Sequence, residues 1–358
     1  MELKKIYEKI EAGERITFAE GVLLFEKGDL YNLGRLANIV RYRHHPNNIV
    51  TFVVDRNVNY TNICSTACKF CAFYRPPGHP EGYVLPLEEI MAKIEELVSV
   101  GGTQLLMQGG THPELGLEYF KNLFQEIKKR FPKVQIHSLS PPEIVYLAKK
   151  EGLSIEEVLK QLQKSGLKSL PGGGAEILSD RVRKIISPNK ISAYEWLSVM
   201  EIAHSLGMKT TATMMFGHVE NYEDRVIHLE SLRNLQDKTG GFTAFIPWSF
   251  QPANTALNHL LPAGGMDYLR TVAISRIYLD NFPSIQASWV TQGAKIAQLS
   301  LYFGTNDFGS TMLEENVVRA AGVTYRLPMK EIITTIRGAG FIPAKRNTHY
   351  EILEVYKE

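Results

Sequence analysis

Long hydrophobic runs and a strong charge of either sign are both absent from this sequence. No apolar stretch reaches the roughly 18 residues that a membrane-spanning helix needs, and the charged, amphipathic N-terminus differs from a secretory signal. Lysine and arginine total 40 against 38 aspartate and glutamate residues, which gives a formal net charge of +2. We therefore expect neither a nucleic-acid partner nor a membrane partner.

Cysteine is scarce as well. The chain has three cysteines, and all of them lie within one short stretch, as Cys64, Cys68 and Cys71. An odd number cannot pair completely into disulfides, and three thiols are one short of a closed tetrahedral zinc site. Unpaired cysteines without an export signal favour the reducing cytoplasm.

Three thiolates suit zinc, copper(I) or an iron–sulfur cluster, and in a four-iron cubane they would leave one iron with an open coordination position. An open position distinguishes a reactive metal centre from a structural one. Three alternatives stay open at this point. The thiols could be buried packing residues, a zinc site completed by His79, or a redox pair with one further cysteine.

The rest of the chain alternates between two kinds of segment. Short apolar or β-branched runs occur near residues 51–62, 103–108, 134–138, 167–170, 209–215, 242–247, 285–289 and 301–304. Amphipathic stretches separate most of them, at 87–99, 117–130, 155–165, 193–206, 222–236, 266–281 and 293–300. Strands that alternate with helices in this number predict an α/β fold, a closed (β/α)8 barrel of the TIM type, with an open doubly wound sheet as the alternative.

Three regions follow from this pattern. We expect a helical N-terminal extension over residues 1–50, the barrel over 51–310, and a C-terminal extension over 311–358 that is helical and packs on the barrel. The spacing of Thr17 and Glu20 predicts a capping box at the start of a helix in the first region.

The active site of such a barrel lies at the C-terminal ends of its strands, and unusual residues follow the predicted strands here. The first strand runs into the cysteines, and the second runs into Gly109 and Gly110. Ser140 follows the third strand, and Glu176 follows the fourth after three glycines. The loops after the fifth, sixth and eighth strands contain His218, Glu220, Gln251 and Asp307.

The spacing Cys-x3-Cys-x2-Cys, with Phe70 before the last cysteine, resembles the signature of radical S-adenosylmethionine (SAM) enzymes, and the resemblance covers the whole barrel. It implies a [4Fe-4S] cluster held by Cys64, Cys68 and Cys71, with SAM bound to the open iron. One electron from the cluster would cleave SAM to methionine and a 5′-deoxyadenosyl radical, which takes hydrogen from a substrate.

The resemblance also implies which residues bind SAM. Gly109 and Gly110 match the glycine motif that meets its amino group, and Glu176 matches an acidic residue near the ribose or amino group. Arg181 or Arg183 would bind the SAM carboxylate. Ser140 and Phe70 are further candidates, through a hydroxyl contact and through stacking near the adenine. The alternatives are a tight turn for the glycines, a solvated helix face for the arginines and core packing for the phenylalanine.

Longer strings narrow the resemblance. Residues 59–75, 79–83, 170–178 and 246–257 are similar to the dehypoxanthine futalosine cyclase family of the futalosine route to menaquinone. Trp248 and Gln251 favour this family over aminofutalosine synthase and the radical domains of deazaflavin (FO) synthase. The implied substrate is dehypoxanthine futalosine, and the implied electron donor is a flavodoxin or a ferredoxin.

The implied reaction is a radical cyclisation. Hydrogen leaves the ribose C4′, the carbon radical closes on the benzoate ring, and loss of one electron and one proton restores aromaticity. A base near the ring must take that proton, and His218, Glu220 and Asp307 are the candidates. The candidates for binding substrate are Tyr60, Asn62, Arg75, His79 and Gln251. A zinc-stabilised barrel that binds a ligand without radical chemistry is the alternative from a different class.

Overall fold

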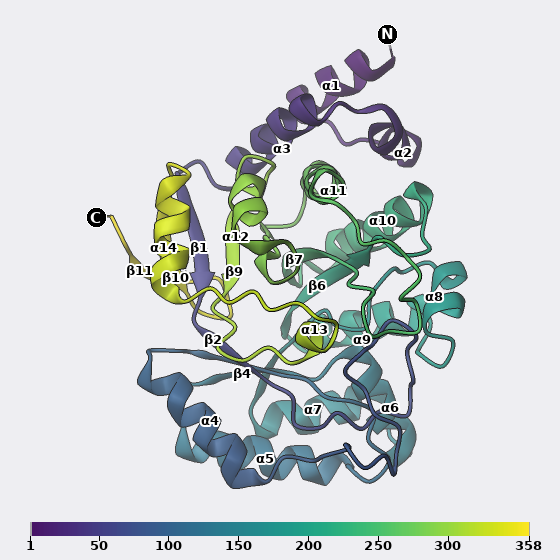
Figure 1. Ribbon diagram of the computed structural model, residues 1–358, viewed down its shortest axis with the longest axis vertical. Helices are drawn as coiled ribbons and strands as arrows, with labels where there is room; N and C mark the ends of the chain where they lie inside the picture. The colour runs from purple at the N-terminus through teal and green to yellow at the C-terminus, as the bar shows by residue number, and fades with distance from the viewer. Residues whose placement is uncertain (1, 358) are drawn as a thin grey trace.

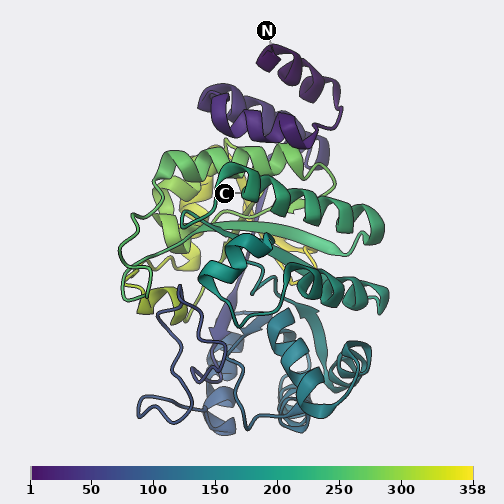
Figure 2. The ribbon, with the colours of Figure 1, turned by 90° about the vertical axis from the view of Figure 1, so that its right-hand side faces the viewer.

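A curled parallel sheet dominates the protein, which a computed structural model describes over residues 2–357 (Figures 1 and 2). Its seven strands are hydrogen-bonded in chain order, and every neighbouring pair is parallel. The strands are β2 (Asp55–Val58), β3 (Gln104–Met107), β4 (Gln135–Ser138), β5 (Leu167–Leu170), β6 (Lys209–Phe216), β7 (Phe242–Ser249) and β8 (Ser284–Ile285).

A second sheet stands beside the first, with the strand order β11-β10-β1-β9. It consists of β1 (Ile49–Val53), β9 (Asp307–Ser310), β10 (Ile342–Arg346) and β11 (Ile352–Val355). The chain runs from β1 into β2 with only Val54 between them, and one parallel bridge, Gln286 to Asp307, connects the ends of β8 and β9. The expected β/α barrel class is confirmed, as a curled seven-stranded half-barrel with this second sheet next to both of its edges.

Helices cover the outside of the half-barrel, as βα crossovers require. Several begin at the predicted residues because a serine or asparagine caps them in a capping box, for example Ser154, Ser192 and Asn221. The helices are α4 (Leu87–Ser99), α5 (Leu117–Arg130), α6 (Pro141–Glu151), α7 (Ile155–Ser165), α8 (Asp180–Ile186), α9 (Ala193–Ser205), α10 (Tyr222–Thr239), α11 (Gly265–Tyr278) and α12 (Trp289–Ser300). Within residues 2–357, none of the helices is both long enough and apolar enough to cross a membrane.

Three N-terminal helices precede the barrel: α1 (Glu2–Ala12), α2 (Phe18–Lys27) and α3 (Leu30–His44). They lie against α10 and α11, at one end of the molecule (Figure 1). The predicted capping box at Thr17 and Glu20 is present, with both of its hydrogen bonds formed. These helices lie far from the cysteine loop, so they contribute to stability rather than to the cavity described below.

The predicted eighth strand is misplaced by a few residues. Residues 301–304 form a turn after α12, and the strand that follows is β9, which begins at Asp307. Leu301 is fully buried and the Phe303 ring packs against Gly34 of α3, so this apolar run is buried by a helix rather than by strand pairing. Asp307 consequently lies within a strand and not in a loop at the mouth of the barrel.

The C-terminal region is more than a helical extension. It contains α13 (Val317–Ala320) and α14 (Met329–Gly338), but it also supplies β10, which pairs with β1 in parallel, and β11. At the end of β10, Arg346 donates two hydrogen bonds to Asp307, at 2.5 and 3.0 Å. Both side chains are buried, so this ion pair ties the C-terminal strand to β9 in the interior.

Replacing Asp307 with Asn tests how much the buried ion pair with Arg346 contributes to stability. The guanidinium of Arg346 would stay buried without its counter-charge, so we expect unfolding to become easier by about 3 kcal/mol. Glu118→Gln is the matched control, because it removes an exposed ion pair with Lys121 and should cost less than about 1 kcal/mol. Chemical denaturation of both variants measures the difference, and equal stability of the two would contradict the proposed importance of the buried pair.

Candidate functional site

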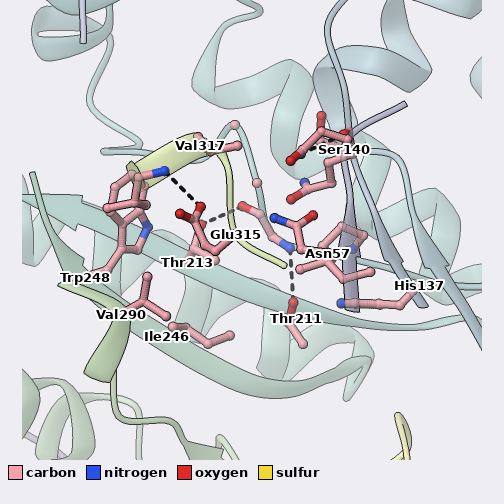
Figure 3. A pocket seen from close by; sticks show the side chains of 18 of the residues that line it. Asn57, His137, Ser140, Thr211, Thr213, Ile246, Trp248, Val290, Glu315 and Val317 are labelled. Atoms are coloured by element: carbon pink, nitrogen blue, oxygen red, sulfur yellow. Dashed lines mark hydrogen bonds between the residues drawn. The ribbon is translucent and has the colours of Figure 1, made fainter. Parts of the chain in front are cut away.

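A cavity of about 390 Å³ lies within the barrel. Its lining comes from the strands β2, β3, β4, β6 and β7, from the loop after β5, from the loop that contains the cysteines, and from segments near residues 286–291, 310–318 and 346–350. Figure 3 shows part of this lining, with Asn57 and His137 on one side and Trp248 and Val290 on the other. The volume suits a small organic molecule.

The three cysteines occupy one edge of this cavity, on the long loop between β2 and α4. All three thiols are free. Backbone hydrogen bonds hold the loop from several sides: the N–H of Cys64 donates to the carbonyl of Arg75 at 2.9 Å, and that of Lys69 donates to Ile186 at 2.9 Å. The loop is therefore held in place before any metal binds.

The donor chemistry of the three thiols fits a soft metal centre such as an iron–sulfur cluster. Burial raises the pKa of Cys68 to about 12 and also raises the pKa of Cys71, so these thiols become thiolates only when a soft metal displaces the proton. Over residues 2–357, no three His, Cys, Asp or Glu side chains converge closely enough to hold one ion. A cubane accepts each thiolate on a separate iron, whereas zinc needs them to converge.

His79, the predicted fourth ligand of a zinc site, is engaged elsewhere. Its Nδ1 accepts the backbone N–H of Glu81 at 3.1 Å, and it is not among the described residues that line the cavity. His79 would therefore have to move to the cavity edge to complete a zinc site with the cysteines.

Gly109 and Gly110 line the cavity directly beside the cysteine loop. A Cβ on Gly110 would lie 2.2 Å from the carbonyl oxygen of Ile63 and 2.5 Å from the Cβ of Cys64. A Cβ on Gly109 would lie 2.6 Å from the ring of Tyr60. Both glycines are thus required for the close approach of β3 to the cysteine loop, whatever further contact they make with a ligand.

Glu176 lines the cavity and pairs with a lysine that the sequence reasoning missed. The Oε1 atom of Glu176 lies 2.7 Å from Nζ of Lys190, and both side chains are almost completely buried. The same ammonium group lies 4.8 Å from the centre of the Phe70 ring. A carboxylate, an ammonium group and an aromatic face therefore meet next to the cysteines, which suits a zwitterionic ligand with an aromatic base.

The two arginines considered for the SAM carboxylate lie outside the lining of the cavity. Arg181 is half exposed and pairs with Asp224. Arg183 is buried and donates to the backbone carbonyls of Gly174, Ala175 and Ile191, so it holds the loop that carries Glu176. Ser140 does line the cavity, but its hydroxyl donates to Glu143 in the capping box of α6.

Four of the residues considered for substrate binding form hydrogen bonds within the protein and do not line the cavity in the described part of the chain. The Tyr60 hydroxyl donates to Glu143 at 2.6 Å, and the Asn62 amide bridges Glu81 and Tyr83. Arg75 pairs with Glu81 and also donates to carbonyls of the cysteine loop, and Gln251 donates to Ser249. These contacts shape the loops around the cavity.

The three residues considered as bases likewise lie outside the described lining of the cavity. His218 contacts the carbonyl of Met215 and the carboxylate of Glu220, and that carboxylate also pairs with Arg225. Asp307 pairs with Arg346 and accepts a hydrogen bond from Thr51 at 2.6 Å. Each group is engaged in a buried network within the protein, and only the network of Asp307 reaches the cavity in the described part of the chain, through Arg346.

Several residues that line the cavity were not predicted from the sequence. One feature of the sequence, polar residues at alternating positions, could have indicated some of them. Asp55, Asn57 and Asn59 alternate along the first strand, so they face the barrel interior together, and polar residues at such positions indicate a wet cavity. The further polar or charged lining residues include Gln104, His137, Glu315, Arg346 and Thr348.

Two family models match the chain. Residues 58–232 match the radical SAM superfamily, and residues 239–358 match the model described as the CofH/MqnC C-terminal region. The second match includes Trp248, Val290 and the lining segments near residues 310–318 and 346–350.

Similar proteins match over the full length. A cyclic dehypoxanthine futalosine synthase from Halalkalibacterium halodurans is 48% identical, over 100% of this chain and 97% of the relative. One from Streptomyces coelicolor is 45% identical, over 100% and 90%. An aminodeoxyfutalosine synthase from Thermus thermophilus is 40% identical, over 98% and 96%. Among solved structures, methylornithine synthase has the same fold, with a TM-score of 0.75 at 18% identity, over 94% of this chain and 97% of that one.

Gly110→Ala tests whether close packing of β3 positions the cysteines. The added Cβ meets a backbone oxygen that cannot rotate away, so the loop must shift. We expect the variant to fold and to bind less than half the iron and sulfide of the parent after anaerobic reconstitution. Gly264→Ala is the control, because nothing lies within 4 Å of its added Cβ. Full cluster loading in Gly110→Ala would show that the loop tolerates the shift.

Proposed function

The chain is a radical SAM enzyme of the cyclic dehypoxanthine futalosine synthase family, and we propose that it converts dehypoxanthine futalosine into cyclic dehypoxanthine futalosine. Enzymes of this superfamily use a [4Fe-4S] cluster and SAM. The observation that carries the proposal is the set of three free cysteines at the edge of a cavity of about 390 Å³, in a chain that matches these synthases from end to end.

Cys64, Cys68 and Cys71 would hold the cluster. Glu176 and Lys190, paired at 2.7 Å beside them, would bind the ammonium, carboxylate or ribose groups of SAM. When bound, the cluster would supply one electron, and SAM would supply a 5′-deoxyadenosyl radical that takes hydrogen from the substrate. The electron that the substrate ring releases in the last step passes to an acceptor. A flavodoxin or ferredoxin as reductant and a cytoplasmic location, which keeps the thiols reduced, belong to the same proposal.

The rest of the cavity would receive the substrate. A carbon radical must be protected from water until the ring has closed, and the walls of the cavity would provide this protection. The C4′ radical adds to the benzoate ring, forming one carbon–carbon bond. The ring then loses one electron and one proton to regain aromaticity. In sum, substrate and SAM give the cyclised product, methionine, 5′-deoxyadenosine and one proton.

Glu315 is the group that we propose as acceptor of the ring proton. It lines the cavity, and in the close-up view it is drawn on the same side as Trp248 and Val290 (Figure 3). Backbone N–H groups of Val318 and Arg319 donate to its two oxygens at 2.8 and 2.9 Å, which fixes the carboxylate. Burial raises the pKa of Glu315 despite these bonds, and a carboxylate of raised pKa is a better base.

The proposed function predicts the fate of two hydrogens. With dehypoxanthine futalosine, SAM and a reductant, the reconstituted enzyme should form a product lighter than the substrate by two hydrogens. Deuterium at ribose C4′ should appear in 5′-deoxyadenosine, and deuterium at the closure position of the ring should appear in solvent. Mass spectrometry follows both labels. Consumption of the enolpyruvyl ether of 3-hydroxybenzoate instead would favour an aminofutalosine synthase.

Glu315→Gln should separate the early and late steps. Hydrogen abstraction does not need the base, so 5′-deoxyadenosine should still form, while cyclised product per 5′-deoxyadenosine should fall about tenfold or more. In the parent that ratio should also fall as the pH drops through the pKa of Glu315, because the protonated acid cannot accept a proton. The neighbouring Glu314→Gln, which affects an ion pair with Arg56 and Lys93 outside the cavity, should keep the parent ratio. An unchanged ratio in Glu315→Gln would exclude it as the base.

A further inference from the structure

One buried arginine holds the two chain segments that carry the Glu176–Lys190 ion pair. Arg183 of α8 is 3% exposed. Its Nη1 donates to the carbonyl of Ala175 at 2.6 Å, directly before Glu176 in the chain. Its Nε and Nη2 donate to the carbonyl of Ile191, directly after Lys190, at 3.0 and 2.6 Å. The guanidinium thus links the two backbones from which the paired side chains arise.

Glu176 has a backbone conformation that needs such support. Its φ is 44°, in the left-handed region that residues with a side chain rarely adopt. Conformations of this kind persist where the surrounding contacts enforce them. The carbonyls of Ala175 and Ile177, on both sides of Glu176, accept from Nη1 of Arg183 at 2.6 and 3.5 Å. The carbonyl of Glu176 itself accepts from the N–H of Met215 at 3.0 Å. These contacts enforce the conformation in which the Glu176 side chain reaches the ammonium of its partner.

The hydrogen bonds of Arg183 show that it acts through the backbone. A guanidinium group has five N–H donors. All five are used on backbone carbonyls, since Nη2 also donates to Gly174 at 3.2 Å. No donor is left for the carboxylate of a ligand, and over residues 2–357 Arg183 is not part of the cavity lining. Arg183 therefore acts on a ligand through the residues that it positions.

The position of Lys190 matters because its segment lies against the cysteine loop. The amide of Asn189 donates to the carbonyl of Thr66 at 3.4 Å, and the Lys190 ammonium lies 4.8 Å from the centre of the Phe70 ring. Lys190 and Glu176 both line the cavity. A shift of either backbone would therefore displace a charge at the edge where the cysteines lie.

We propose that Arg183 is a positioning residue for SAM, which sets the geometry of the Glu176–Lys190 pair and thereby the affinity for SAM without touching it. The inference rests on the proposed function, in which this pair binds SAM. Its planar fork reaches carbonyls of two segments at once, whereas a lysine ammonium is a single point of donation. The geometry of Arg183, in addition to its charge, is therefore required.

Arg183→Lys tests the proposal, because it keeps the positive charge and removes the fork. The reconstituted protein is titrated anaerobically with SAM by calorimetry. SAM affinity should fall about tenfold, as expected when one hydrogen bond to a ligand is lost. The iron and sulfide content should equal that of the parent. Should this variant not fold, Arg183→Gln, which buries no charge, takes its place in the same titration.

A double-mutant cycle separates positioning from an independent effect. Glu176→Gln removes the carboxylate charge, keeps the shape of the side chain, and should itself weaken SAM binding about tenfold. If Arg183 acts through Glu176, the double variant should bind SAM about as weakly as Glu176→Gln alone. Independent effects would multiply to about a hundredfold, and that result would overturn the inference.

Arg276→Lys is the matched control for the loss of a buried arginine. Arg276 is fully buried, and it donates to the carbonyls of Phe282 and Gly304 and to the side chain of Asn306. It lies outside the described lining of the cavity. Both lysine variants should lower the melting temperature, but Arg276→Lys should bind SAM as the parent does.

The outcomes separate the inference from the function on which it rests. Equal loss of SAM affinity in the two lysine variants, unchanged affinity in Arg183→Lys, or loss of iron from it would each overturn the inference while the cyclase assignment stands. Failure of the parent protein to bind SAM would instead overturn the proposed function, and the inference with it.

Discussion

Three thiolates have to reach one cluster from a loop of a few residues, and this requirement governs the surroundings of the loop. Gly110 brings β3 within contact of the Cys64 backbone, where any side chain would collide with the loop. Backbone hydrogen bonds that the N–H groups of Cys64 and Lys69 donate to the carbonyls of Arg75 and Ile186 hold the loop at both sides. Glu176 and Lys190 then form a buried ion pair at its edge. Because the thiols, the pair and the aromatic ring of Phe70 share one cavity edge, the remainder of the barrel interior is left for a substrate.

Much of the fold follows from local pattern, and the segments that were predicted wrongly are those whose structure depends on contacts between residues far apart in the chain. The predicted segments 87–99, 117–130 and 155–165 coincide with α4, α5 and α7, because all three have clear apolar periodicity, and a capping box at Ser154 also marks the start of α7. The run 301–304 has the composition of a strand, yet Phe303 packs on Gly34, a contact between residues far apart in the chain. β10 contains a proline and two charged residues, so only its pairing with β1 reveals it as a strand.

The cysteine triplet could be read from the sequence because its spacing encodes its chemistry, and its cluster-binding role remains a prediction. Polar residues in the loops were harder to interpret, since a sequence does not tell whether a side chain faces a cavity or bonds to its own loop. Tyr60 and Gln251 bond internally, whereas Lys190 and Glu315 line the cavity. Thr348 lines the cavity just after β10, whose pairing with β1 across the whole chain no local pattern predicts.

The central claim is that Cys64, Cys68 and Cys71 hold a four-iron cluster with one open iron, and Mössbauer spectroscopy of the ⁵⁷Fe-reconstituted protein tests it most directly. The account predicts a [4Fe-4S] spectrum in which one iron site changes its isomer shift when SAM is added, and the loss of this cluster on changing any one of the three cysteines to alanine. A protein that keeps an unchanged cluster in all three alanine variants, or in which SAM alters no iron site, would contradict it.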